Sequence, residues 1–128
     1  MAPAAKTAPK KVLRVLVIDD NLDQVHTLAY LISDCGHHAD YAINATVALD
    51  LAQRLKPDVI LLDLALPDAS GVALARKLRA LPGLQAVYLV AITGTRISRE
   101  EAIAAGFNEY LRKPVQFAAL EALLATKA

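Results

Sequence analysis

The sequence of 128 residues predicts one α/β domain in which helices cover both faces of a parallel sheet. Apolar segments rich in β-branched residues alternate in strict order with segments whose apolar positions recur at helical spacing, which is typical of strand–helix–strand units. The strand segments are also continuously apolar, as expected of strands buried on both faces. Right-handed crossovers between such strands place helices on both sides of the sheet.

The first unit shows how each element is recognised. An apolar run at 12–18 stops at Asp-Asp-Asn (19–21), three residues of types that cap helices well. Apolar positions then follow a helical stripe over 22–35, and Gly36 ends it. The remaining units are predicted in the same way, with strands at 38–43, 58–63, 86–93 and 109–112 and helices at 46–55, 72–81, 99–106 and 115–125.

The composition is that of a folded protein. Hydrophobic residues make up 55% of the chain and charged residues 21%, which is enough apolar material for a sizeable core. The net charge of +1 comes from scattered acids and bases, so we expect neither a nucleic acid nor a membrane as a direct partner. The one cysteine, Cys35, rules out an internal disulfide and fits a cytoplasmic protein.

The domain is expected to occupy 12–126. Residues 1–11 are rich in Ala, Pro and Lys and lack the apolar core of a secretory signal, so they are predicted to be a short disordered lead-in. No apolar run approaches the length of a transmembrane helix. Whether the chain stands alone or belongs to a longer regulator stays open.

Polar side chains end or directly follow four of the five predicted strands, at the edge where ligands bind in sheets of this kind. They are Asp19 and Asp20, Asp63, Thr93 and Lys113. Three carboxylates at one edge repel each other, so at least one should have a raised pKa. A divalent cation between the acids, or the charge of Lys113, would relieve the repulsion. A small set of oxygen ligands suits Mg²⁺, which keeps several waters.

In this order, Asp19–Asp20, LLDLALPDASG (61–71), Thr93–Gly94 and Lys113–Pro114 resemble the receiver domain of bacterial two-component response regulators. The resemblance extends from Val12 to about Leu124. It implies a flavodoxin-like, doubly wound (βα)5 fold like that of chemotaxis regulators, with a five-stranded parallel sheet in the order 2-1-3-4-5. The segments at 36–52 and 113–125 are most similar to receivers of hybrid histidine kinases.

The resemblance implies a role for each matching residue. Asp63 would accept a phosphoryl group from a phosphohistidine on a histidine kinase or a histidine phosphotransfer protein, since carboxylates can act as covalent acceptors. Asp20, Asp63 and the backbone carbonyl of Ala65 would bind Mg²⁺, or Mn²⁺ in its place, and Asp19 would help through a water. Lys113 would neutralise charge on the phosphoryl oxygens.

Three further residues would shape the loops around the acceptor. Pro67 and Gly71 follow Asp63, and Gly71 is expected to supply a backbone angle that a side chain would resist. Pro114 biases Lys113 towards an extended conformation. The Lys113–Pro114 bond is typically cis in the family, but the residues themselves leave the isomer open.

The resemblance also implies a conformational switch. Thr93 and Gly94 would contact the phosphoryl oxygens, and Thr93 would move to do so. Tyr110 would then swing inward and change the surface formed by the fourth helix, fifth strand and fifth helix. The stretch 93–113 is shorter than is usual in the family, so the fourth helix is expected to be short or displaced. The last helix lacks the charge pattern through which DNA-binding relatives dimerise, so we expect a monomer or weak dimer.

Several residues have plainer interpretations. Asn21 and Leu22 open the first helix beside the acids and are expected to belong to the surface on which the partner docks. Val25 is expected in the core. His37 and His38 are adjacent and lack the spacing of metal ligands, so they are predicted to be loop histidines.

Other classes of protein remain as alternatives. A phosphatase of the haloacid dehalogenase type also uses Mg²⁺ and an aspartate nucleophile, but it needs a second aspartate two residues later, where this chain has Ala65. A flavodoxin-type binder needs a loop rich in Ser, Thr or Gly after the first strand, where this chain has DDNLDQ. An adaptor that is never phosphorylated would leave the site residues unexplained. The kinase, the signal and the downstream effector are not specified.

Overall fold

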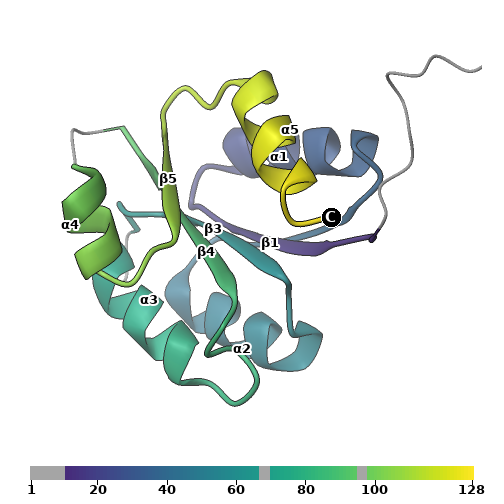
Figure 1. Cartoon of the computed structure of the whole chain (residues 1–128). Coiled ribbons are helices and arrows are strands. Elements are labelled where there is room, and N and C mark those ends of the chain that lie inside the picture. Colours follow the sequence, from purple (N-terminus) through teal and green to yellow (C-terminus); the bar gives the residue numbers. More distant parts are fainter. Residues whose placement is uncertain (1–10, 67–69, 95–97) are drawn as a thin grey trace, which may run out of the picture.

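The computed structural model describes residues 11–66, 70–94 and 98–128 as a twisted sheet between layers of helices (Figure 1). The strands are β1 (Arg14–Ile18), β2 (His38–Ala42), β3 (Val59–Asp63), β4 (Tyr88–Thr93) and β5 (Glu109–Arg112). The helices are α1 (Leu22–Asp34), α2 (Ala45–Leu55), α3 (Gly71–Ala80), α4 (Arg99–Ala104) and α5 (Phe117–Ala125). Every predicted element is present in the predicted order. The lead-in expected at 1–11 lies, apart from Lys11, outside the described residues.

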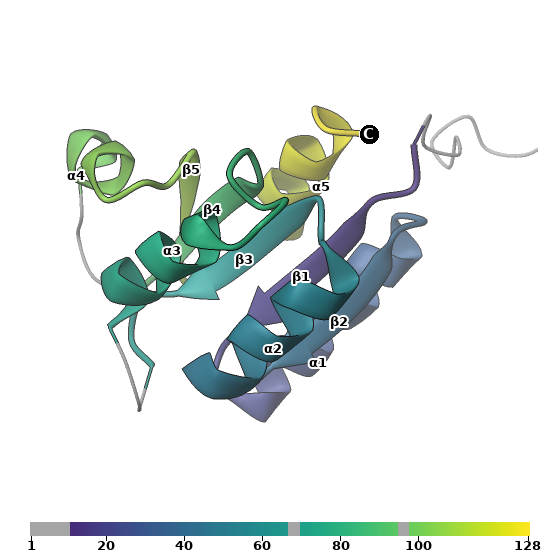
Figure 2. The same ribbon diagram turned by 90° about the horizontal axis from the view of Figure 1, so that it is seen from below.

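The sheet is parallel and has the strand order β2-β1-β3-β4-β5. β1 pairs with both β2 and β3, β3 pairs with β4, and β4 pairs with β5. This confirms the predicted fold class and strand order. Because the strands run in one direction, their carboxyl ends lie along one edge of the sheet (Figure 2).

Two apolar layers hold the helices onto the sheet. α2 and α3 cover one face and α1 and α5 the other (Figure 1). Successive strand residues point to opposite faces, so Leu16 and Ile60 enter the first layer and Val15 and Leu61 the second. Each such buried aliphatic side chain contributes about 1.5–3 kcal/mol relative to exposure. Each continuous apolar run of the sequence therefore contributes side chains to both apolar layers.

α4 has six residues, in keeping with the expectation of a short fourth helix. It begins with a capping box, in which the N–H of Glu101 donates to Ser98 Oγ and the N–H of Ser98 donates to the Glu101 carboxylate. The helix flanks the β5 end of the sheet (Figure 1). Its one buried residue is Ala102, so packing anchors it weakly.

His37 is a buried structural residue and is only 7% exposed. Its Nδ1 accepts the N–H of Leu13 at 2.9 Å, and its own N–H donates to the carbonyl of Ile32. His38 begins β2, as the predicted strand at 38–43 implied, so the description of it as a loop histidine is wrong. His37 lies in a loop as predicted, but it is buried and ties the end of α1 to the approach to β1.

Candidate metal and phosphoryl site

Three aspartates meet at the carboxyl edge of the sheet. Asp63 is the last residue of β3, and Asp19 and Asp20 directly follow β1. Carboxylate oxygens from the three residues lie within 4.8 Å of one another. They meet because β1 and β3 are paired in register, which brings Ile18 opposite Leu62. Asp19 and Asp63 are buried, whereas Asp20 is exposed.

Lys113, directly after β5, supplies a positive charge to the same cluster. Its Nζ donates to Asp63 Oδ2 at 3.0 Å and lies 3.5 Å from Asp19 Oδ2. Burial by itself would lower the pKa of Lys113, but the hydrogen bond to Asp63 and the charges of Asp19 and Asp63 outweigh burial and raise that pKa. The lysine is therefore a permanent cation between two buried carboxylates.

Asp19 carries the clearest electrostatic conflict in the cluster. Its side chain is 1% exposed, and its Oδ2 receives no hydrogen bond from the described residues. Burial raises the pKa of Asp19, the N–H that Asn21 donates to Oδ1 opposes the rise, and the charge of Asp63 adds to it. The predicted rise in pKa is confirmed, although burial contributes more to it than the neighbouring carboxylate does.

The donor set fits a divalent cation. Carboxylate oxygens are the hard ligands that Mg²⁺ prefers, and the exposed side of Asp20 leaves room for the waters that this ion retains. A cation would also satisfy the buried Oδ2 of Asp19. Ala65 donates its N–H to Asp63 Oδ1 at 3.0 Å, which holds that carboxylate in place. The role of the Ala65 carbonyl as a ligand remains a prediction.

Thr93 and Gly94 lie at the end of β4, next to the lysine. Thr93 is 2% exposed, and a Cβ added to Gly94 would lie 3.9 Å from Lys113 Cδ. The backbone N–H of Lys113 donates to the carbonyl of Thr93 at 2.9 Å. Both residues therefore lie at the edge where the acids gather, as a phosphate-binding role requires.

Tyr110 lies on β5, is partly buried and packs against the apolar layer that contains Phe107. Tyr110 is in register with Ala91, and the residue two positions beyond Ala91 is Thr93. Because side chains two apart in a strand share a face, Thr93 and Tyr110 lie on the same face of neighbouring strands. The expected coupled movement of Thr93 and Tyr110 stays a prediction.

Gly71 is required for its small size. It is not among the glycines with positive φ, so the predicted special backbone angle is wrong. A Cβ added to Gly71 would lie 2.6 Å from Leu64 Cα and 3.2 Å from the carbonyl oxygen of Asp63. The start of α3 thus lies directly against the backbone that follows Asp63. Pro67 lies outside the described residues, and the Lys113–Pro114 peptide bond is cis.

The start of α1 lies beside the acids. Asn21 caps this helix by accepting the N–H of Gln24 on its Oδ1 at 3.1 Å. Leu22 is 50% exposed, whereas Val25 is fully buried, as predicted. The expected role of Asn21 and Leu22 in docking stays a prediction.

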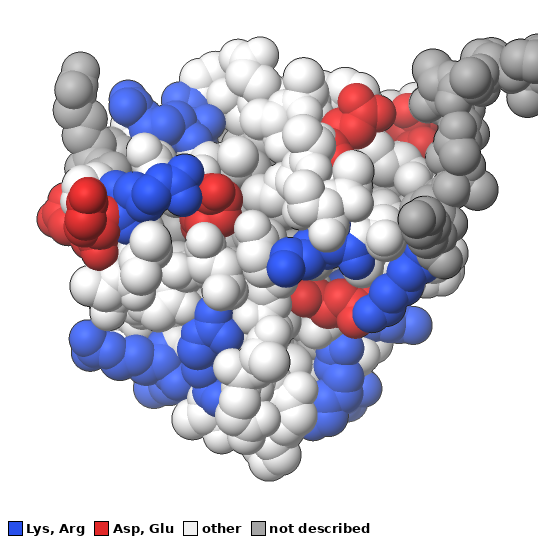
Figure 3. Space-filling model, in the orientation of Figure 1, with Lys and Arg blue, Asp and Glu red and all other residues white. Residues whose placement is uncertain are grey.

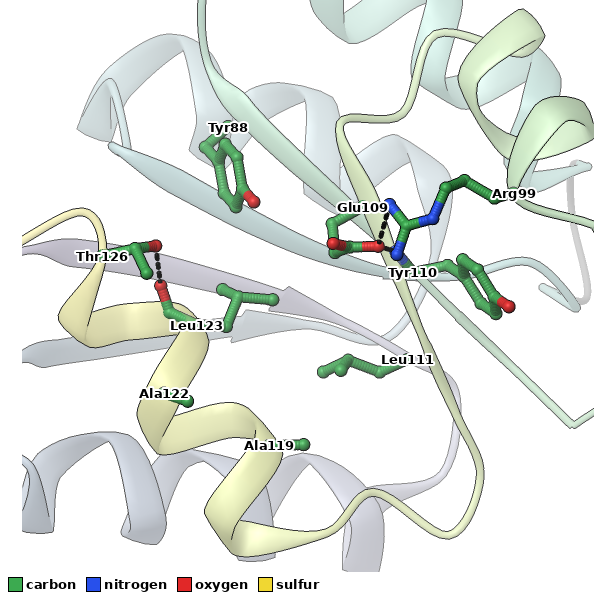
Figure 4. Close-up of a pocket in the computed structure, with 9 residues that line it drawn as sticks. All are labelled: Tyr88, Arg99, Glu109, Tyr110, Leu111, Ala119, Ala122, Leu123 and Thr126. Atoms are coloured by element: carbon green, nitrogen blue, oxygen red, sulfur yellow. Dashed lines mark hydrogen bonds and ion pairs between the residues drawn. The ribbon is translucent and has the colours of Figure 1, made fainter.

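A hollow of about 360 Å³ lies between β5 and α5, and none of the acids at the carboxyl edge lines it. The residues that line it include Tyr88, Arg99, Glu109, Tyr110, Leu111 and Leu123 (Figure 4). On the face shown in Figure 3, acidic and basic side chains are interspersed among uncharged ones. Within the described ranges, no helix is both long and apolar enough to cross a membrane. Of the residues that line the hollow between β5 and α5, sequence reasoning singled out Tyr110 but not Arg99 or Glu109.

A (βα)5 sheet with three acids and a lysine at its carboxyl edge defines the class of phosphoacceptor receiver domains. Residues 15–125 match the family model of the response regulator receiver domain, and the chain belongs to this family. The predicted resemblance is thereby confirmed.

Solved structures agree with this assignment. A CheY-like receiver domain from Methylobacillus flagellatus is 33% identical with a TM-score of 0.84, and the match covers 92% of this chain and 100% of that one. The receiver domain of the sensor histidine kinase PA1611 from Pseudomonas aeruginosa has magnesium coordinated in its active site cleft. It is 27% identical with a TM-score of 0.81, over 91% of this chain and 97% of that one.

A third relative is a much longer protein. The histidine kinase BarA of Escherichia coli is 27% identical over 117 residues, which are 90% of this chain and 13% of BarA. The chain thus corresponds to a small part of that kinase, in keeping with the resemblance to receivers of hybrid kinases.

Proposed function

We propose that Asp63 accepts a phosphoryl group from a phosphohistidine and that the chain thereby acts as a switch in two-component signal transduction. The observation that carries this proposal is the convergence of Asp19, Asp20 and Lys113 on Asp63. This is the arrangement that a negatively charged donor needs, because the acids alone would repel it.

In the transfer, an oxygen of Asp63 forms a bond to phosphorus while the bond from the histidine nitrogen to phosphorus breaks. The imidazole that leaves takes up a proton from solvent. The side chain of Asp63 is 5% exposed, so the donor approaches along the open side next to Asp20. The hydrogen bond that Lys113 donates to Asp63 Oδ2 passes to a phosphoryl oxygen, where it stabilises developing charge.

When bound, Mg²⁺ or Mn²⁺ would neutralise negative charge on the phosphoryl oxygens. The carboxylates of Asp20 and Asp63 and the backbone carbonyl of Ala65 would hold it. Asp19 would contact it through a water, which would supply the hydrogen bond that Asp19 Oδ2 lacks among the described residues.

The readout of phosphorylation proceeds through Thr93 and Tyr110. A phosphoryl group adds roughly −1.5 to −2 charges and three strong acceptor oxygens beside Thr93 and Gly94. Thr93 donates its hydroxyl to one of these oxygens and so vacates space on the face of the sheet that it shares with Tyr110. Tyr110 then moves inward and alters the surface of α4, β5 and α5.

The proposed partner is a histidine kinase or a histidine phosphotransfer protein that docks over Asn21 and Leu22. The proposed unit is the domain at 12–126, acting in the cytoplasm as a monomer or weak dimer and without direct contact to nucleic acid. Asp63 would be modified stoichiometrically, so the protein would be a phosphoacceptor and not an enzyme with turnover of a free substrate.

Incubation with acetyl phosphate and Mg²⁺ tests this function. The intact protein should gain the mass of one phosphoryl group, and the gain should disappear with a chelator. Asp63→Asn should remain unmodified, whereas Asp50→Asn, on the exposed face of α2, should be modified like the wild type. Equal labelling of Asp63→Asn, or continuous hydrolysis of phosphate monoesters without a stable adduct, would refute the proposal.

A further inference from the structure

The side chain of Arg99 connects α4 to the proposed switch residue. Arg99 is the first residue of α4, and Tyr110 is the second residue of β5. Arg99 Nη1 lies 3.0 Å from Glu109 Oε1, and its guanidinium carbon lies 5.9 Å from the centroid of the Tyr110 ring. Figure 4 shows the guanidinium group between these two side chains. One side chain of α4 therefore engages two successive residues of β5.

Glu109 completes the arrangement. The same Oε1 that pairs with Arg99 accepts the backbone N–H of Tyr110 at 3.0 Å. Among the described strands, β5 lies at the edge of the sheet and pairs only with β4, so its outer backbone groups are open to side chains. Arg99 thus contacts Tyr110 directly through the ring and indirectly, through Glu109, at the backbone.

We propose that Arg99 is a latch that holds Tyr110 outward and sets how readily the domain responds to phosphorylation. This inference rests on the proposed function, in which Tyr110 moves inward. The Tyr110 ring is only partly buried, and the side chain of Arg99 is 58% exposed. An inward movement of the ring would withdraw it from the guanidinium group of Arg99. Arg99 is a positioning residue, because it acts on Tyr110 and takes no part in the chemistry at Asp63.

The two contacts of Arg99, with the Tyr110 ring and with Glu109, are weak enough to break when Tyr110 moves. An exposed cation–π contact and an exposed ion pair each contribute little to the stability of a fold. In an equilibrium between two arrangements, however, the same contacts change the population ratio by about two- to tenfold. α4 is short and buries only Ala102, and Arg99 joins its first turn to Glu109 and Tyr110 of β5.

Fluorine NMR of protein labelled with 3-fluorotyrosine tests the latch. The chain has four tyrosines, and loss of one signal in Tyr110→Phe assigns Tyr110. In Arg99→Ala without additives, the Tyr110 signal should move towards its position in wild-type protein treated with Mg²⁺ and beryllofluoride. The beryllofluoride concentration for half-maximal change should fall about two- to tenfold. Arg99→Lys keeps the charge but loses the planar group, so its values should be intermediate.

Two further variants sharpen the test. Glu109→Gln removes the ion pair while Arg99 remains, and it should shift the Tyr110 signal in the same direction as Arg99→Ala. Arg54→Ala removes an exposed arginine–carboxylate pair on α2, where Arg54 Nη2 lies 2.7 Å from Asp50 Oδ2, and it should behave like the wild type.

The outcomes separate the latch from the proposed function. If wild-type Tyr110 responds to beryllofluoride but Arg99→Ala has the wild-type signal and midpoint, the latch is overturned and the function stands. Equal shifts in Arg54→Ala and Arg99→Ala would also overturn it. If the wild-type protein shows neither a response nor an adduct on Asp63, the proposed function is overturned and the latch with it.

Discussion

The ammonium group of Lys113 donates a hydrogen bond of 3.0 Å to Asp63, a residue 50 positions earlier in the chain. This contact places a cation where the proposed phosphoryl group would carry its negative charge. It also separates two buried carboxylates, since Lys113 Nζ lies 3.5 Å from Asp19.

Replacement of Lys113 by alanine should therefore affect phosphorylation and metal binding in opposite directions. The rate of labelling by acetyl phosphate should fall about tenfold or more, because an electrostatic stabiliser of the transition state is lost. Mg²⁺ should bind more tightly, because a competing positive charge is removed. Mass spectrometry and calorimetric titration measure the two quantities. Weaker Mg²⁺ binding in Lys113→Ala would contradict the assignment of Lys113 to the phosphoryl group.

Mg²⁺ should stabilise the folded protein through the acidic cluster. A ligand that binds only the folded state at one hundred times its dissociation constant adds about 2.7 kcal/mol. We expect the melting temperature of the wild type to rise with Mg²⁺ and that of Asp20→Asn to rise much less. Asp23→Asn, an exposed change in the first turn of α1, serves as the control and should keep the wild-type response. An equal rise in Asp20→Asn would remove Asp20 from the ligand set.

The stability of the fold should fall below about pH 6.5 because of His37. Burial lowers the pKa of His37 from its ordinary 6.5, so the unfolded chain takes up a proton there while the folded chain does not. The stabilising contribution is therefore complete above the unfolded pKa, declines as the pH falls below it and levels off beneath the folded pKa. Each unit of depression corresponds to about 1.4 kcal/mol.

Urea unfolding at pH 7.5 and pH 5.5 measures this dependence. His37→Gln should be less stable at pH 7.5 by about 1–3 kcal/mol, because the Leu13 N–H loses its partner, and it should show a smaller loss on acidification. His26→Gln changes an exposed histidine and should keep the wild-type pH dependence. An unaltered slope in His37→Gln would assign the pH dependence to other groups.

Gly71→Ala should destabilise the domain although it introduces a better helix former. Alanine within a helix gains at most about 1 kcal/mol over glycine. The added Cβ would lie 2.6 Å from a backbone atom of Leu64, and such overpacking costs about 1–3 kcal/mol. The free energy of unfolding should therefore fall. Gly94→Ala, whose Cβ would make an ordinary 3.9 Å contact, should fold normally, and a Gly71→Ala protein of raised stability would contradict the steric argument.

The general fold and the site were predictable because they follow local rules. Continuous apolar runs alternating with helical stripes predict parallel strands and crossover helices, and the strand order of the family resemblance is the one observed. The aspartates at the ends of β1 and β3 meet because parallel strands end at a common edge. The shortness of α4 could be inferred from the number of residues between Thr93 and Lys113.

Other features were missed because they depend on contacts between distant residues. The role of Gly71 is set by the approach of α3 to Leu64 and not by its own φ angle. His37 is buried where its Nδ1 accepts the N–H of Leu13, which lies 24 positions earlier, just before β1. No local pattern marks Arg99, because an arginine at the start of a helix is ordinary until β5 places Glu109 and Tyr110 beside it.

By itself the sequence determined which segments are strands and helices and which polar residues follow the strands, because periodicity and capping are encoded over a few neighbouring residues. Only the tertiary structure decided how strongly those polar residues interact. The pKa of Asp19, the hydrogen bond from Lys113 to Asp63 and the contacts of Arg99 all depend on distance and burial. Those quantities exist only once segments far apart in the chain have packed together.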